Sequence, residues 1–390
     1  MNNTIYLDNN ATTHVDPRVL EAMLPYLQDN FGNASSNHKF GQCALDGVKI
    51  ARKQVADLIG AEENEIIFTS GATEAINMAI KGVAEYYQNK GKHIVTVATE
   101  HSAVLDTCKY LETKGLDVTY LPVKRDGLIE LSALKKAMKN ETILVSVMHV
   151  NNETGVIQPI KEISHIVHEK GAFFMSDTTQ AVGKILINVD DLGIDLLCLS
   201  GHKMYAPKGI GALYMRQRKG RVKLTPLIHG GGQENNFRSG TQNVPGIVAL
   251  GKACELAKLE MKQNADKIKE LRDYLESELL KIDGAFVNGS HTNRIYNVSN
   301  ITFPGIDSDA LIMALSKPID GTPNIIVSNG SACSSRSVEP SHVLRAMEPD
   351  GRYGFNRIRI SLGKTNLNEE VDVFINTIKY VISHLRIIIS

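Results

Sequence analysis

The chain has 390 residues, with 43 lysines and arginines against 43 aspartates and glutamates, so its formal net charge is zero. This balance argues against a protein that binds nucleic acids through overall positive charge. With 43% hydrophobic and 22% charged residues, the composition is that of a globular protein rather than a disordered one. No apolar run approaches the roughly 20 residues of a membrane span, and no secretory signal is visible. We therefore expect a cytoplasmic protein of enzyme size.

Between residues 45 and 220, apolar β-rich runs alternate with segments of helical spacing. Strands are predicted over residues 65–69, 94–98, 118–121, 143–148, 173–176, 196–199 and 210–215. Helices are predicted over residues 48–59, 74–87, 131–138 and 160–169. Apolar strands alternating with helices predict an α/β fold with a mainly parallel sheet covered on both faces. Ligands of such sheets bind beyond the carboxyl ends of the strands.

The last third of the chain has a different pattern. A long charged amphipathic helix over residues 248–281 carries the chain away from the sheet. A mixed set of elements follows: a strand at 297–303, a helix at 308–315, a Gly/Ser/Pro-rich loop at 329–340, a strand at 357–361 and a helix at 368–385. We expect a large domain over residues 15–257, and a smaller α+β domain made of residues 1–14 and 258–390.

The five cysteines are odd in number, widely spaced and without a Cys-x-x-Cys pair, so neither a zinc site nor a disulfide framework is supported. Cys333 lies among small polar residues (328–336, SNGSACSSR) that predict an exposed loop with an accessible thiol. Cys198 lies in an apolar strand and is expected to be buried. Packing is the default role for Cys43, Cys108 and Cys254, which fall in helical patterns. Loop position alone leaves the function of Cys333 open. The histidines form no metal-ligand spacing, and no metal is expected.

Polar residues follow two of the predicted strands. Lys203 ends the string SGHK (200–203) after strand 196–199. A lysine at a strand end can be desolvated and have its pKa lowered, as a Schiff-base lysine requires, although a lone turn lysine is usually a surface residue. Asp177 ends the preceding strand, where its carboxylate suits either a protonated ring nitrogen or an N-cap over Gln180.

Residues 69–74 (TSGATE) run from a strand into a helix. Small residues let backbone N–H groups approach an anion, and the helix N-terminus adds favourable partial charge. The same string is also an acceptable capping sequence. Neither a Walker loop nor a G-x-G-x-x-G after a strand is present, so nucleotide binding loses support.

Together these motifs resemble the cysteine desulfurases (NifS/IscS-like), pyridoxal-phosphate enzymes of fold type I in the class-V aminotransferase family. The resemblance spans nearly the whole chain. It rests on ten strings in the family's order: 6–13 (YLDNNATT), 32–36 (GNASS), 70–75 (SGATEA), 99–103 (TEHSA), 151–155 (NNETG), 177–180 (DTTQ), 200–203 (SGHK), 238–241 (RSGT), 330–334 (GSACS) and 359–363 (RISLG).

The resemblance implies a role for each matching residue around pyridoxal 5'-phosphate. Lys203 is implied to hold the cofactor as a Schiff base and to move protons, and Asp177 to pair with the pyridine nitrogen. His101 is implied to stack on the ring and assist proton transfer. The ring hydroxyl is implied to be hydrogen-bonded by Asn152 and Gln180, and the phosphate to be held by Ala72, Thr73, Ser200 and His202.

Two further implications concern the neighbouring subunit and the substrate. Thr241 is implied to reach the phosphate of a second subunit, which predicts a homodimer. Arg359 is implied to hold the substrate carboxylate, with Asn33 nearby, because a planar guanidinium matches a carboxylate with two parallel hydrogen bonds. Arg357 lies on the same face of the predicted strand, so the choice between the two arginines rests on the motif alone.

The implied reaction removes sulfur from L-cysteine, giving alanine and a persulfide on Cys333. The sulfur then passes to an acceptor protein that serves iron–sulfur assembly, tRNA thiolation or DNA phosphorothioation, and the sequence does not choose among them. Residues 316–324 (SKPIDGTPN) look longer than in other family members. The alternatives are a selenocysteine lyase or an aminotransferase on the same fold, which would use the same Lys203 and Asp177, or a non-catalytic sulfur carrier or scaffold.

Overall fold

The structure is a computed structural model that describes residues 4–218, 222–317, 323–329, 341–348 and 355–389. Its main sheet has seven strands in the order β2-β8-β7-β6-β5-β3-β4. These strands are β2 (Ile66–Thr69), β3 (His93–Val97), β4 (Asp117–Leu121), β5 (Thr142–Ser146), β6 (Phe173–Asp177), β7 (Leu196–Ser200) and β8 (Gly211–Met215). Strand β8 is antiparallel to both neighbours, and the other adjacent pairs are parallel. The predicted α/β fold with a mainly parallel sheet is confirmed.

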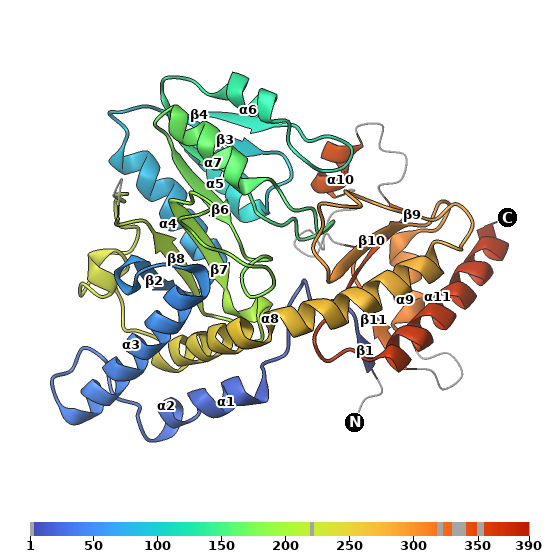
Figure 1. Cartoon of the computed structure of the whole chain (residues 1–390), viewed down its shortest axis with the longest axis horizontal. Helices are drawn as coiled ribbons and strands as arrows, with labels where there is room; N and C mark the ends of the chain where they lie inside the picture. Colours follow the sequence, from blue (N-terminus) through green and yellow to red (C-terminus); the bar gives the residue numbers. More distant parts are fainter. Residues whose placement is uncertain (1–3, 219–221, 318–322, 330–340, 349–354, 390) are drawn as a thin grey trace.

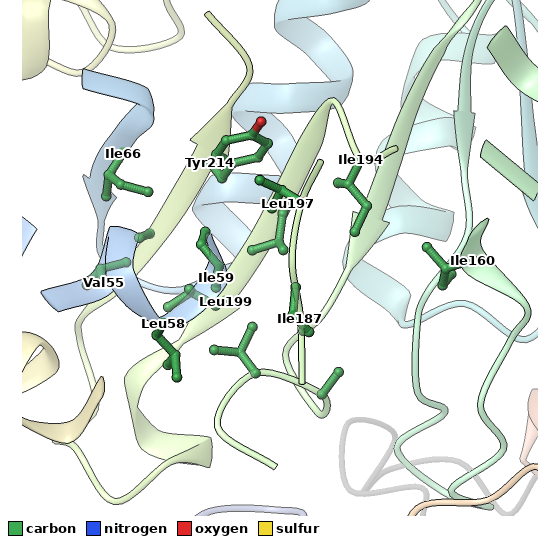
Figure 2. Close-up of a cluster of buried hydrophobic side chains, with 14 of the residues drawn as sticks. Val55, Leu58, Ile59, Ile66, Ile160, Ile187, Ile194, Leu197, Leu199 and Tyr214 are labelled. Atoms are coloured by element: carbon green, nitrogen blue, oxygen red, sulfur yellow. The ribbon is translucent and has the colours of Figure 1, made fainter. Parts of the chain in front are cut away.

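Helices cover both faces of this sheet because its strands are apolar on both sides. Along β7, Leu197 and Leu199 belong to one buried cluster, while Leu196 and Cys198 belong to the cluster on the opposite face. Figure 2 shows part of the first cluster, where side chains of α3 meet those of β2, β7 and β8. Helices α3 (Lys39–Ile59), α6 (Leu131–Ala137) and α7 (Ile160–Glu169) contribute to this cluster, together with the first half of the long helix described next. The opposite face is covered by α4 (Ala72–Tyr86) and α5 (Ser102–Glu112).

Helix α8 (Val244–Leu279) connects this layered unit with a second core (Figure 1). Leu250 and Cys254, in its first half, pack in the cluster of the main sheet. Leu271 and Leu275, in its second half, pack in a separate cluster. That second cluster is formed by β9 (Phe286–Val287), β10 (Val298–Thr302), β12 (Arg357–Ser361), α9 (Ser308–Leu315) and α11 (Asn368–Ile389).

The N-terminal segment belongs to this second core. Strand β1 (Thr4–Tyr6) pairs in parallel with β11 (Asn324–Ile326), and Ile5 and Leu7 are buried in the second cluster. The three remaining helices are α1 (Pro17–Met23), α2 (Pro25–Gln28) and α10 (His342–Met347). None of the helices in the described ranges is long and apolar enough to cross a membrane.

Candidate active site

A cavity of about 600 Å³ opens where the carboxyl ends of β2, β3, β5, β6 and β7 meet. This is the edge at which a mainly parallel sheet is expected to bind ligands. The N-terminal segment adds Asn10 and Ala11 to the wall, and the C-terminal part of the chain adds Ser341, His342, Arg345 and Arg359. The cavity therefore lies between the main sheet and elements near the second core.

Thirteen residues are predicted from the sequence to form the site. Ten of them line this cavity: Ala72, Thr73, His101, Asn152, Asp177, Gln180, Ser200, His202, Lys203 and Arg359. Asn33 and Thr241 are exposed and do not line it, and Cys333 lies outside the described residues. Proximity in one cavity does not by itself assign roles, so the individual roles stay predictions.

Lys203 ends a short 3-10 turn, Gly201–Lys203, that follows β7 directly. Its Nζ donates hydrogen bonds to the carbonyl oxygens of Asn10 and Ala11, at 2.7 Å each. The N-terminal segment also holds the turn, because Thr13 Oγ1 donates to the carbonyl of His202 and accepts from the N–H of Tyr205. The amine is thus fixed at the cavity wall by contacts that come from the start of the chain.

Asp177 is buried at the end of β6, and one of its carboxylate oxygens already accepts hydrogen bonds from within the chain. Oδ1 accepts hydrogen bonds from the N–H and the hydroxyl of Thr179, at 2.9 and 2.5 Å. No donor to Oδ2 is found among the described residues, and Asp177 lines the cavity. Its second oxygen is therefore suited to pair with a protonated nitrogen of a bound molecule.

His101 is the N-cap of α5, where its Nδ1 accepts a hydrogen bond from the N–H of Ala103 at 3.0 Å. Burial lowers the pKa of the imidazole below its usual 6.5, and the charges of Lys203 and His342 lower it further, although Asp177 opposes the shift. The lowered pKa favours the neutral ring, and because Nδ1 is an acceptor, the neutral ring has its proton on Nε2.

The start of α4 has the features that suit an anion. Gly71 precedes the helix, and no side chain caps the first N–H groups. Loop and strand approach closely here, since a Cβ added to Gly211 would lie 2.7 Å from the Cα of Gly71. Thr73, Ser200 and His202 line the same cavity as Gly71. Uncapped N–H groups beside hydroxyl and imidazole donors are the chemistry that binds a phosphate.

The charge of Glu74 in the first turn of α4 is compensated. Burial would raise the pKa of Glu74, but hydrogen bonds from Arg238 and Ser70 outweigh it and lower the pKa. Arg238 Nε lies 2.8 Å from Glu74 Oε1. The carboxylate is thus held by its own partners beside the predicted phosphate site.

The two arginines of β12 differ in what they face, although both side chains are only 2% exposed. Arg359 lines the cavity, where its Nη2 donates to Asp8 Oδ1 at 2.7 Å and its Nη1 to the carbonyl of Asn152 at 3.2 Å. Arg357 does not line the cavity and lies 3.9 Å from a carboxylate oxygen of the buried Glu153. This geometry favours Arg359 as the binder of a substrate carboxylate.

Three of the four cysteines that the structure describes are unsuited to attack a substrate. Burial raises the pKa of the Cys108 thiol to about 12 and also raises the pKa values of Cys198 and Cys254. All three are fully buried, as predicted, and Cys43 is half-buried on α3. A buried, protonated thiol is a poor nucleophile.

Sequence reasoning missed several residues of the cavity wall. Asn10 lies within a quoted motif but was assigned no role, although its carbonyl accepts from both Lys203 and Gln180. His342 and Arg345 carried no signal in the sequence. His342 Nε2 lies 2.8 Å from the carbonyl oxygen of Glu100, next to His101.

The class-V aminotransferase family profile matches residues 5–374. The chain belongs to this family. The cysteine desulfurase IscS of Ehrlichia chaffeensis is 50% identical over 372 residues, which cover 95% of this chain and 89% of that protein. A solved NifS-like protein has a TM-score of 0.90 and 41% identity, covering 98% of this chain and all of the other. A structure of SspA in complex with cysteine has a TM-score of 0.80 and 39% identity, covering 93% and 99%. The resemblance to cysteine desulfurases is confirmed.

The described residues fit pyridoxal phosphate, the cofactor of this family. An uncapped helix N-terminus suits the phosphate, the Asp177 oxygen without a described partner suits the ring nitrogen, and the Lys203 amine lies in the same cavity. A doubly charged phosphate and a protonated ring nitrogen thus both have complementary groups in the wall of this cavity.

Proposed function

We propose that this chain removes the sulfur of L-cysteine, releases alanine and carries the sulfur on Cys333. It is a pyridoxal-phosphate-dependent cysteine desulfurase. The observation that best supports this assignment is that Lys203, Asp177, His101 and Arg359, from four separate segments, line one cavity beside the N-terminus of α4. An aminotransferase would use the same groups, so Cys333 decides between the two activities.

The proposed mechanism assigns each step to a residue of the chain. Bound pyridoxal phosphate supplies an electron sink for charge that develops at the substrate's α-carbon. Lys203 would hold the cofactor and afterwards move the α-proton through its Nζ, and Asp177 would keep the ring nitrogen protonated. His101, neutral with its proton on Nε2, would assist proton transfer. Arg359 would orient L-cysteine by its carboxylate.

Cys333 is proposed as the sulfur acceptor. Its thiolate would form an S–S bond with the substrate sulfur while the bond between that sulfur and the β-carbon breaks. The electron pair of the broken bond stays on the carbon, which is protonated and leaves as the methyl group of alanine. Sulfur remains on the enzyme as a persulfide, so a difficult cleavage is divided into two easier steps.

A single-turnover experiment tests this function. Reconstituted protein is incubated with L-cysteine, alanine is measured, and the peptide that contains Cys333 is examined by mass spectrometry. We expect alanine and one reductant-sensitive sulfur on that peptide. Product that depends on an added keto acid, without sulfur on Cys333, would indicate an aminotransferase. Activity with selenocysteine but not with L-cysteine would indicate a selenocysteine lyase.

We further propose a homodimer and a sulfur-acceptor protein as partners. Thr241 is exposed and lies outside the cavity of its own chain, as a residue that serves a neighbouring chain's site must. Static light scattering measures the mass in solution, and a fully active monomer would contradict the dimer. The pathway of the acceptor, a cytoplasmic location and the lack of direct nucleic-acid binding stay predictions.

We also propose that residues 15–257 form a large domain, and residues 1–14 and 258–390 a small one. The two separate hydrophobic clusters, joined by α8, support this division. The pairing of β1 with β11 supports the assignment of the N-terminal residues to the small domain. In this arrangement the substrate would bind between the domains.

A further inference from the structure

Lys184 lies outside the cavity but contacts a residue of its wall. Its Nζ is 2.7 Å from Oε1 of Gln180, which is four residues earlier in the segment between β6 and β7. On the other side of the amide, Gln180 Nε2 donates to the carbonyl of Asn10 at 2.9 Å. An amine only donates to Oε1 and a carbonyl only accepts from Nε2, so the two contacts together fix which way the amide points.

Lys184 contacts this amide from outside the active-site cavity. It lines a second cavity of about 40 Å³, which also has Lys203 and Asn297 in its wall. No described carboxylate forms an ion pair with Lys184, which is unusual for a half-buried lysine. Burial, together with the positive charges of Lys203 and Arg359, lowers the pKa of Lys184 to about 7. A neutral amine still donates, so the contact with Gln180 does not depend on the charge.

We infer that Lys184 is a positioning residue that holds the Gln180 amide with its NH₂ group toward the cofactor's ring hydroxyl. The inference rests on the proposed function and deepens it. Of the two N–H groups on Gln180 Nε2, one bonds Asn10 and the other stays available to the cavity. If the amide turned over, its carbonyl oxygen would face the carbonyl of Asn10, and the buried nitrogen would lose its acceptor. Loss of Lys184 alone leaves the buried Oε1 without its donor.

The variant Lys184→Met tests this role because methionine keeps the unbranched shape and removes the donor. Apoprotein of the full chain is titrated with pyridoxal phosphate, and the dissociation constant and the position of the visible absorbance band are measured. We expect a dissociation constant about tenfold higher, the effect of one buried hydrogen bond, and a shifted band. Lys184→Arg should restore both values to within about twofold. Lys161→Met, at an exposed position on α7, is the matched control and should match the wild type.

A double-mutant cycle separates positioning from packing. If Lys184 acts through Gln180, then Lys184→Met should add no further loss of cofactor affinity to Gln180→Ala. Additive losses, or a lower unfolding temperature with an unchanged dissociation constant and spectrum, would overturn the inference. Should Lys184→Met not fold, Lys184→Leu, which also lacks a donor, takes its place in the same cycle. A wild-type protein that binds no pyridoxal phosphate would refute the proposed function instead, so the two failures are distinguishable.

Discussion

The two arginines of β12 offer the sharpest test of how this enzyme holds its substrate. Arg359 and Arg357 are two residues apart, equally buried and each close to one acidic side chain, but only Arg359 lines the cavity. We compare Arg359→Met with Arg357→Met. The first should raise KM for L-cysteine, and the second should leave KM within a factor of about three while lowering stability.

The magnitude follows from the contacts of each guanidinium. Arg359 uses one N–H of each Nη nitrogen on Asn152 and Asp8, and its Nε is buried, so the second N–H on each Nη remains for a substrate carboxylate. A hydrogen bond to a charged group contributes about 1.5–3 kcal/mol, and about 1.4 kcal/mol is tenfold in affinity. Loss of a bidentate contact should therefore raise KM about 100-fold. Arg357 instead faces Glu153. Burial raises the pKa of Glu153, and the positive charge of Arg357 opposes this shift.

Removal of Arg357 should cost about 1–3 kcal/mol of stability, because Glu153 loses a compensating charge and can only take up a proton. Removal of Arg359 leaves Asp8, which is 14% exposed and can be solvated by water. The assay is initial-rate alanine formation over a range of L-cysteine concentrations, together with urea denaturation of both variants. A 100-fold rise in KM for Arg357→Met with an unchanged KM for Arg359→Met would refute the assignment.

Three other residues carry separate predictions. Lys203→Ala should abolish covalent cofactor binding and alanine formation, and turnover at the wild-type rate would exclude it as the cofactor lysine. Cys333→Ala should still bind cofactor and L-cysteine but gain no sulfur in peptide mass spectrometry; in wild-type protein, sulfur on Cys198 or Cys254 would show that another thiol acts. Burial lowers the pKa of His149 to about 4, so the unfolded chain binds more protons between pH 6.5 and 4, and stability should fall over that range by about 3 kcal/mol. In urea titrations His149→Asn should flatten this decrease, and identical slopes would contradict it.

The main sheet could be predicted because the spacing of apolar residues in its strands and helices is visible in the sequence itself. Each of its predicted strands is present to within two residues. Helix α3 begins at Lys39, nine residues before the predicted start at residue 48. The prediction missed its first turns because they carry Gly41, Ala44 and Gly47 in place of large apolar residues. Gly47 is buried there, and an added Cβ would meet the ring of Tyr26. Where glycine provides the close packing, the sequence shows no large apolar residues at helical spacing, so the helix is not predicted.

The sequence placed Cys108 in a helical pattern but gave helix α5 no bounds, for a related reason. Its buried residues Val104, Thr107, Cys108 and Leu111 have helical spacing, but threonine and cysteine weaken the apolar contrast on which such predictions depend. The role predicted for His101 therefore came from the resemblance and not from the pattern, and its position at the N-cap of α5 came from the structure.

The parts of the site at strand ends were accessible to sequence reasoning, because parallel strands bring their carboxyl ends to one edge. Asp177 and Lys203 were found in this way. The C-terminal wall was not accessible, since His342 and Arg345 reach the cavity through the packing of α10, whose buried residues form a separate small cluster with Val123. The choice between Arg357 and Arg359 also needed the structure, because strand alternation places both on the same face.

The N-terminal segment connects substrate binding with the cofactor lysine. Asp8 bonds Arg359, while two residues later the carbonyl of Asn10 accepts from both Lys203 and Gln180. The Asn10 side chain donates to the carbonyl of Asn152, which also accepts from Arg359. Since β1 pairs with β11, this segment is anchored to the second core, while Thr13 bonds the turn that carries Lys203. A displacement of that core relative to the sheet would therefore shift the carboxylate-binding arginine and the hydrogen-bond partners of Lys203 together, so that substrate orientation and the cofactor lysine are set by the same short stretch of chain.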